Sequence, residues 1–248
     1  MLAFHGFNRN PDDFMPFGKE LGEQYTILAF DLFFHGKSYL KGEFQAPYFT
    51  LAELRTVTEK ILSIYQAEEF ELMAHSFGGR LVFNLVELFP DKVKGIYLMA
   101  PDALRFNPGY WFATQTGAGQ YIMRRYKQAP GPILSFMRML PRLGLYSEKA
   151  IEFYISQVSY GPVRERVYQL WMGHRKTIVN QKVIARLIRK HRIRFRLFLG
   201  RFDSVIPAKA GEKLIRLSGP TASMIYLETG HRVQEKHGVI AGFIREEK

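Results

Sequence analysis

The sequence predicts an α/β protein with a mostly parallel sheet, helices on both faces of the sheet and one long helical insertion. Three observations lead to this fold class. Short apolar runs alternate with amphipathic stretches in two flanks, residues 1–102 and 193–248. The segment between the flanks, residues 103–192, contains no convincing strand. With 248 residues, the chain is long enough to bury one full core and to carry such an insertion.

The first flank opens on a strand, and strands and helices alternate from there. The apolar run at residues 2–5 predicts a short strand that stops at Gly6. After Pro11, apolar residues at helical spacing behind two acids predict a helix. Residues 25–31 predict a buried strand that ends in an acid, and residues 51–66 predict a long amphipathic helix.

The same alternation continues through the other predicted elements. Residues 70–76 form an apolar run that leads directly into two glycines and a helix to Phe89. Since parallel strands need helical crossovers, this pattern indicates a mostly parallel sheet of six strands. The remaining predicted strands are residues 93–100, 193–199 and 224–227, and the remaining predicted helices are residues 207–217 and 233–245.

The insertion differs from the flanks in structure and in charge. Helical patches at residues 148–158 and 178–190 are separated by prolines. Residues 103–194 hold seventeen Lys or Arg against three Asp or Glu, a net charge of +14, whereas the rest holds eighteen against twenty, a net −2. We therefore expect a near-neutral body, residues 1–102 and 193–248, that carries a basic helical lid, residues 103–192.

The composition excludes several classes of protein and site. Apolar residues at 47% argue against disorder, and no apolar run reaches the ~20 residues of a membrane span. The absence of cysteine excludes a disulfide framework, a thiolate metal site and a cysteine nucleophile. The seven histidines are scattered and residues 117–119 follow no strand, so neither a metal nor a phosphate-bearing cofactor is expected. Since the start at Met1 lacks the pattern of a secretory signal, a cytoplasmic location is expected.

The most informative motif is the stretch Ala74–Gly79, AHSFGG, at the junction of a strand and a helix. A nucleophile on such a turn has a strained backbone, which needs small residues two positions to either side. Here these residues are Ala74 and Gly78. The turn would direct the Ser76 hydroxyl toward the positive end of the following helix. The motif alone also fits a serine in an ordinary strand-to-helix turn.

Two further residues follow predicted strands and complete a triad with Ser76. Asp203 lies in a turn after one strand, and His231 lies in the loop after the next. A serine, an acid and a histidine in this order, each just past a parallel strand, would meet at one edge of the sheet. We expect His231 to act as the general base for Ser76 and Asp203 to orient His231. Asp102, just after another strand, is the alternative acid.

Backbone N–H groups are the donors expected to stabilise an oxyanion in such a site. Phe7, in the loop after the first strand, would supply one donor, and Phe77, directly after the nucleophile, would supply the other. His5, His35 and His75 lie in or beside these loops. We expect these three histidines to be structural rather than catalytic.

Five blocks of sequence occur in order: HGF at 5–7, D…HG…S at 31–38, AHSFGG at 74–79, G…D…IP at 200–207 and GH at 230–231. With them the chain resembles the α/β-hydrolase superfamily, and more narrowly its lid-bearing branch of small esterases, carbon–carbon bond hydrolases and related acyl-processing enzymes. The resemblance covers both flanks and implies the α/β-hydrolase fold, whereas the insertion matches no motif. Serine at position 76 separates the chain from the haloalkane dehalogenases and epoxide hydrolases of this fold, which have aspartate there.

Two departures from the family pattern bear on the fold. Ala74 stands where most relatives have glycine, and alanine is small enough for that position. Relatives have two strands before the one that carries the His-Gly loop, whereas this chain begins at that strand, so the first two of the usual eight strands are expected to be missing. The strand Tyr25–Asp31 would then be an apolar, unprotected edge. Such an edge would favour a homodimer joined there, unless the natural chain starts upstream.

The sequence leaves three functions open. The first is a serine hydrolase that cleaves a carboxylic ester or thioester through an acyl-enzyme on Ser76. The second is an acyltransferase or carbon–carbon bond hydrolase with the same triad. The third is a non-catalytic ligand receptor, which the intact triad disfavours.

The expected partner is a small acyl substrate, which would be anionic if the basic lid recruits it. An acidic membrane surface would be attracted by the same charge, and a solvated face of Lys and Arg is the ordinary explanation. No nucleic acid partner is expected, because nothing in the sequence resembles a recognition fold.

Overall fold

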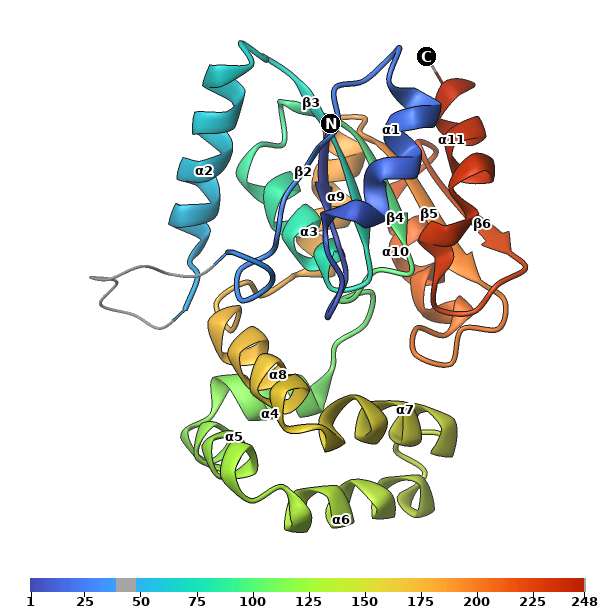
Figure 1. The fold of residues 1–248 in the computed structure, drawn as a ribbon. Coiled ribbons are helices and arrows are strands. Elements are labelled where there is room, and N and C mark those ends of the chain that lie inside the picture. Colours follow the sequence, from blue (N-terminus) through green and yellow to red (C-terminus); the bar gives the residue numbers. More distant parts are fainter. Residues whose placement is uncertain (39–47, 248) are drawn as a thin grey trace.

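The computed structural model describes residues 1–38 and 48–247, and these contain one six-stranded sheet (Figure 1). The strand order is β2-β1-β3-β4-β5-β6, and every pair of neighbours is parallel. The predicted α/β class and the predicted six-stranded parallel sheet are therefore confirmed. The strands are β1 (Leu2–Phe4), β2 (Leu28–Ala29), β3 (Phe70–His75), β4 (Val93–Met99), β5 (Arg194–Gly200) and β6 (Ala222–Leu227).

Helices cover both faces of this sheet. α1 packs against α11 on one face, while α2, α3, α9 and α10 form a row on the other, each in contact with the next (Figure 1). β3, in the middle of the sheet, is buried along its whole length, as expected for a parallel strand covered on both faces. Within the described residues, no helix is both long and apolar enough to cross a membrane. The helices of the body are α1 (Met15–Leu21), α2 (Leu51–Ile64), α3 (Gly78–Leu88), α9 (Gln181–Lys190), α10 (Glu212–Ser218) and α11 (His237–Arg245).

Local sequence signals explain where several of these helices begin. Thr50 precedes α2, and its hydroxyl accepts a hydrogen bond from the Glu53 N–H at 3.2 Å. The Glu53 carboxylate in turn accepts one from the Thr50 N–H at 2.6 Å, which completes a capping box. Asn180 caps α9 in a simpler way, because its side chain accepts a hydrogen bond from the Lys182 N–H at 3.1 Å.

Five further helices form a separate unit beyond the carboxyl ends of the strands (Figure 1). We call this unit, residues 108–173, the cap. It contains no strand in the backbone that the structure describes. A small apolar cluster of Met123, Tyr126 and Met172 holds its helices together. The helices of the cap are α4 (Pro108–Gln115), α5 (Gly117–Gln128), α6 (Gly131–Met139), α7 (Glu148–Ser159) and α8 (Gly161–Gly173).

The predicted insertion, residues 103–192, includes one helix that packs on the body. α9 falls within that range, yet it packs against α3 and α10 and belongs to the body. The cause is its apolar stripe, because Ile184 and Ile188 are buried in the main core and need an apolar partner there. Six of the seventeen basic residues counted between 103 and 194 lie at residues 181–194. That share of the positive charge is therefore on the body and not on the cap.

β2 lies at the edge of the sheet, as predicted, but it is shorter than the strand expected from the sequence. Only Leu28–Ala29 pair with β1. On one side of this pair, the Tyr25 hydroxyl donates a hydrogen bond to Glu71 at 2.6 Å. On the other side, the Leu32 N–H donates to His5 Nε2 at 3.0 Å. At the first end the Met1 amino group also donates to the Thr26 carbonyl at 2.8 Å, whereas at the second end a histidine side chain takes the place of the ladder. A two-residue edge presents few free backbone groups.

Candidate active site

Ser76 lies between β3 and α3 with its backbone in the left-handed region, at a φ of +48°. This conformation is uncommon for a residue with a side chain, so the surrounding structure must hold it. The Ser76 N–H donates to the Met99 carbonyl at 3.0 Å, and the Asp102 N–H donates to the Ser76 carbonyl at 2.7 Å. A Cβ on Gly78 would lie 2.2 Å from the Phe4 carbonyl oxygen. The small residue that the motif requires at position 78 therefore has a direct steric cause.

Ser76, His231 and Asp203 form one hydrogen-bonded chain. Ser76 Oγ lies 3.0 Å from His231 Nε2, and His231 Nδ1 lies 2.8 Å from Asp203 Oδ2. Since a carboxylate only accepts hydrogen bonds, His231 donates its Nδ1 proton to Asp203, which leaves Nε2 to accept from the Ser76 hydroxyl. Both distances suit a nucleophile, a base and the group that orients the base. The structure thus brings together the three residues whose order in the chain suggested a triad.

The backbone of its own turn fixes the Asp203 carboxylate. Its side chain is completely buried, and its second oxygen, Oδ1, accepts the N–H groups of Val205 and Ile206 at 2.8 and 2.9 Å. The loop that carries His231 approaches very closely: a Cβ on Gly200 would lie 2.2 Å from the Gly230 carbonyl oxygen. Glycine at the end of β5 therefore allows the loops of the acid and the base to meet.

His75, the residue before the serine, holds the backbone of His231. Its Nε2 lies 3.0 Å from the His231 carbonyl oxygen, so this nitrogen carries a proton and donates. Burial lowers the pKa of His75 to about 4, and the ring is neutral at pH 7. The sequence suggested only a structural histidine here. The structure gives that role a specific target, the position of the His231 main chain.

The loop after β1 reaches the serine. A Cβ on Gly6 would lie 2.8 Å from His75 Nδ1 and 3.1 Å from Ser76 Cβ, so glycine favours this close approach. In the part of the chain that the structure describes, the N–H groups of Phe7 and Phe77 donate to no other backbone group. Phe77 also directly precedes the first turn of α3, where backbone N–H groups and the helix dipole favour negative charge.

Two buried histidines brace that loop against the loop after β2. His5 Nε2 accepts the Leu32 N–H at 3.0 Å, and His35 Nε2 accepts the Asn8 N–H at 3.0 Å. Burial lowers the pKa of both histidines, that of His35 to about 4. The neutral form is required, because a protonated Nε2 could not accept a hydrogen bond. Both rings hold backbone positions, and among the described residues neither ring forms a hydrogen bond with Ser76.

Asp102, the alternative acid of the sequence analysis, pairs with Arg80 and not with His231. Its Oδ2 accepts from Arg80 Nη2 at 2.7 Å and from Arg80 Nε at 3.2 Å. Arg80 lies on α3 and is buried, and its guanidinium also stacks over the Tyr110 ring at 4.2 Å and donates to the Thr177 carbonyl at 3.3 Å. The assignment of Asp102 as a triad acid is therefore wrong. Arg80 instead ties α3 to α4 of the cap and to the segment that follows α8.

His174 is a second residue that the sequence analysis missed. It follows the last turn of α8 and is completely buried. Its ring packs edge-on against Phe77 and Phe49, with centroids 5.2 and 5.7 Å away. Burial, followed by the charge of Arg80, lowers the pKa of His174 to about 3. A neutral histidine at the end of the cap thus supports the residue next to Ser76. No local pattern in the sequence marks it, since the contact joins segments that are distant in the chain.

Comparison with known proteins establishes the family. A model described as the alpha/beta hydrolase fold matches residues 1–238, and the chain belongs to this family. The probable lysophospholipase BODYGUARD 1 of Arabidopsis thaliana is 31% identical over 113 residues, which are 45% of this chain and 22% of that protein. The chain therefore matches about a fifth of the length of this relative. The uncharacterized hydrolase YugF of Bacillus subtilis (strain 168) is 22% identical over 239 residues, 95% of this chain and 84% of that protein.

Solved structures show the same fold. A thermophilic esterase from Thermogutta terrifontis superimposes with a TM-score of 0.67 at 19% identity, covering 99% of this chain and 88% of that one. A thioesterase domain from the curacin biosynthetic pathway gives a TM-score of 0.64 at 14% identity, with 98% and 90% covered. At these identities the similarity supports the fold alone.

Proposed function

We propose that this α/β-hydrolase is a serine hydrolase that cleaves a carboxylic ester or thioester through an acyl-enzyme on Ser76. The observation that supports this most is the hydrogen-bonded chain from Ser76 through His231 to Asp203, with links of 3.0 and 2.8 Å. The strained backbone of Ser76 adds support, because such strain persists where the surrounding structure enforces it.

In the first half of the proposed reaction, Ser76 Oγ attacks the carbonyl carbon of the substrate while its proton moves to His231 Nε2. Asp203 stabilises the resulting imidazolium through the Nδ1 hydrogen bond. The carbonyl oxygen becomes negatively charged and accepts hydrogen bonds from the N–H groups of Phe7 and Phe77. His231 then gives its proton to the leaving alcohol or thiol, and the acyl group remains on Ser76.

In the second half, a water molecule takes the place of the leaving group. His231 removes a proton from the water as its oxygen attacks the acyl carbon, and the same backbone donors hold the oxyanion. Collapse of this intermediate releases the carboxylic acid and returns the proton to Ser76. His75 contributes by holding the His231 main chain in place during the proton transfers of both halves.

The test is labelling with a fluorophosphonate probe, combined with hydrolysis of a panel of acyl esters and thioesters. Ser76→Ala should abolish labelling and lower kcat by about 10⁴- to 10⁶-fold, and adding His231→Ala should cost little more, because triad members act as a unit. Ser63→Ala, at an exposed serine on α2, is the matched control and should retain both labelling and activity. Near-normal hydrolysis by Ser76→Ala would contradict the proposal and would favour a receptor.

The same experiment separates hydrolysis from acyl transfer. If an added alcohol captures the acyl group from wild-type protein in preference to water, the acyltransferase alternative replaces the hydrolase. If labelling occurs but neither esters nor thioesters are cleaved, the carbon–carbon bond hydrolase alternative is favoured.

A further inference from the structure

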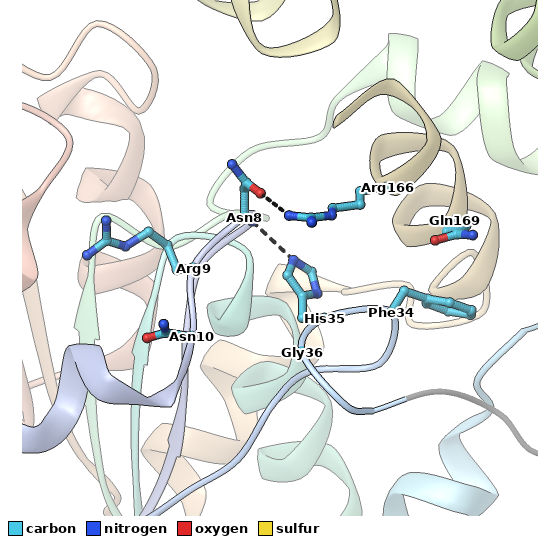
Figure 2. Close-up of a pocket in the computed structure, with 8 residues that line it drawn as sticks. All are labelled: Asn8, Arg9, Asn10, Phe34, His35, Gly36, Arg166 and Gln169. Atoms are coloured by element: carbon cyan, nitrogen blue, oxygen red, sulfur yellow. Dashed lines mark hydrogen bonds between the residues drawn. The ribbon is translucent and has the colours of Figure 1, made fainter. Parts of the chain in front are cut away.

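A polar pocket of about 500 Å³ lies beside the loop that follows β1. Three segments form it: residues 8–10 after β1, residues 34–36 after β2, and α8 of the cap, which contributes Arg166 and Gln169 (Figure 2). The pocket therefore lies where the body meets the cap. No carboxylate side chain is among the described residues that line it.

The positive charge in this pocket belongs chiefly to Arg166. The other arginine, Arg9, is neutralised by Asp13, which receives hydrogen bonds from its guanidinium at both oxygens. Arg166, in contrast, forms no ion pair with any residue that the structure describes. Its Nη1 donates to the neutral side chain of Asn8 at 2.7 Å, and Figure 2 shows the guanidinium directed from α8 toward that loop. The guanidinium of Arg166, an exposed residue, thus has no ion-pair partner among the described residues and faces a polar space with no carboxylate on its lining, although the Asp31 carboxylate packs against Gly36 from behind.

The acidic residue on the same helix does not neutralise Arg166. Glu165 Oε1 accepts a hydrogen bond from Gln169 at 3.1 Å and forms an ion pair with Lys127 at 3.2 Å. His35, at the base of the pocket, is neutral and uses its Nε2 to accept from Asn8. Among these neighbours, only the neutral side chain of Asn8 forms a hydrogen bond with Arg166, and neither Glu165 nor His35 cancels its charge.

The pocket is also close to Ser76. Asn8 follows Gly6 by two residues, and Gly6 approaches Ser76 closely enough that a Cβ would lie 3.1 Å from Ser76 Cβ. Two residues of extended chain span at most about 7 Å, so the pocket wall lies on the order of 10 Å from the serine. A substrate of a few carbon atoms can bridge that distance.

We infer that this pocket binds an oxyanion group, a carboxylate or a phosphate, at the end of the substrate away from the scissile bond, with Arg166 as its main ligand. A guanidinium presents two parallel N–H donors that match the paired oxygens of these groups. The inference rests on the proposed function, since it assigns the polarity of the substrate that Ser76 would attack.

The test compares anionic esters with neutral esters of the same shape. One pair is 4-nitrophenyl hemiglutarate and its methyl ester, which differ at the acyl end. The other pair is 4-(butyryloxy)benzoate and its methyl ester, which differ on the alcohol side. The quantity measured is the ratio of kcat/KM for the anionic ester to that for the neutral ester.

In at least one pair, Arg166→Gln should lower this ratio about tenfold or more, and Arg166→Lys should lower it less, since lysine keeps the charge but loses the two-pronged geometry. Arg142→Gln removes the same charge from an exposed position elsewhere on the cap and should leave the ratio within about twofold. Inhibition by glutarate or by inorganic phosphate then shows which oxyanion is preferred.

Two results would overturn the inference. The first is an equal loss for both members of each pair in Arg166→Gln, which would mean that Arg166 only braces the Asn8 loop. The second is an absence of calorimetric binding of both glutarate and inorganic phosphate to wild-type protein, a readout that does not depend on hydrolysis. Failure of the proposed function would look different, because Ser76→Ala would then keep its activity on the neutral esters.

Discussion

Asp102 and Asp203 occupy corresponding places in the sheet, each shortly after the carboxyl end of a strand, β4 or β5. Their surroundings differ completely. Asp203 has a completely buried side chain and accepts a hydrogen bond from the ring of His231. Asp102 is 31% exposed and pairs with the permanent charge of Arg80. An aspartate at this edge of the sheet can therefore either orient a histidine, as Asp203 does, or pair with an arginine that contacts the cap, as Asp102 does. The residue with which it pairs determines its role.

The largest expected effect concerns the acid next to His231. Asp203→Asn should lower kcat on an activated ester by about 10⁴-fold, because an amide would favour the wrong tautomer of His231. Asp102→Asn should lower kcat by less than about tenfold, since Asp102 contacts neither His231 nor Ser76 through a side-chain hydrogen bond. Steady-state kinetics on the two variants, with circular dichroism to check folding, makes the comparison. Similar losses in both variants would remove the distinction drawn between these two carboxylates.

The next effect is on stability and concerns the ion pair of Asp102 with Arg80. Breaking a fully buried ion pair costs ~3–5 kcal/mol, and the partial exposure of Asp102 reduces the expected cost of Asp102→Asn to about 1–3 kcal/mol. Glu59→Gln, in an exposed pair with Arg55 on α2, is the matched control and should cost no more than about 0.5 kcal/mol. Urea unfolding monitored by fluorescence measures both. A cost for Asp102→Asn as small as that of the control would mean that Arg80 does not need its partner.

The fold, and the meeting of Ser76, Asp203 and His231, could be predicted from the sequence because their signals are local. The strained turn at Ser76 needs small neighbours, and these appear in the sequence as Ala74 and Gly78. The acid and the base each follow an apolar run that forms a parallel strand, so their order in the chain places them at the same edge. Short-range constraints of this kind can be recognised in the sequence because they determine residue types at fixed spacings.

The remaining features depend on contacts between distant segments. The role of Asp102 follows from Arg80, a basic residue within an apolar helix whose partner lies in another loop. His174 meets Phe77 only because α8 folds back onto the body. Its position in the chain and its basic charge place α9 in the predicted insertion. Its location in the body is evident only from its apolar side chains, which are buried in the main core. Packing partners at long range are not encoded in spacing along the chain.

Acid should weaken both regions through a buried histidine in each. His75 supports His231 and His174 lies beside Arg80, and burial lowers their pKa values to about 4 and about 3. An unfolded histidine has a pKa near 6.5, so between the folded and unfolded values the unfolded chain binds more protons. The stability linked to these neutral rings is complete above about pH 6.5 and is lost as the pH falls toward 4, by up to about 1.4 kcal/mol per pH unit for each histidine.

His174→Phe tests this pH dependence, because phenylalanine can occupy the aromatic surroundings without binding a proton. The free energy of unfolding, measured by urea denaturation from pH 8 to pH 4.5, should fall less steeply in this variant than in the wild type. His191→Phe is a useful control, since His191 ends α9 beside the exposed carboxylate of Asp91, away from Ser76. An unchanged slope in His174→Phe would mean that His174 is protonated, or exposed, in the folded protein.

The smallest expected effect is that of salt, which should weaken the exposed charges of the cap but not the buried charge of Arg80. Exposed charges are screened by salt, with a Debye length of about 30 Å at 0.01 M and about 8 Å at 0.15 M. If the basic residues of the cap attract an anionic substrate, raising the salt over this range should lower kcat/KM for an anionic ester about three- to tenfold and change the neutral ester by less than about twofold. Over the same range, the stability cost of Asp102→Asn should stay nearly constant, because its partner Arg80 is buried and poorly screened. Equal salt responses of the two esters would mean that the basic residues of the cap form an ordinary solvated surface and do not attract the substrate. That result would not affect the pairing of Asp102 and Arg80.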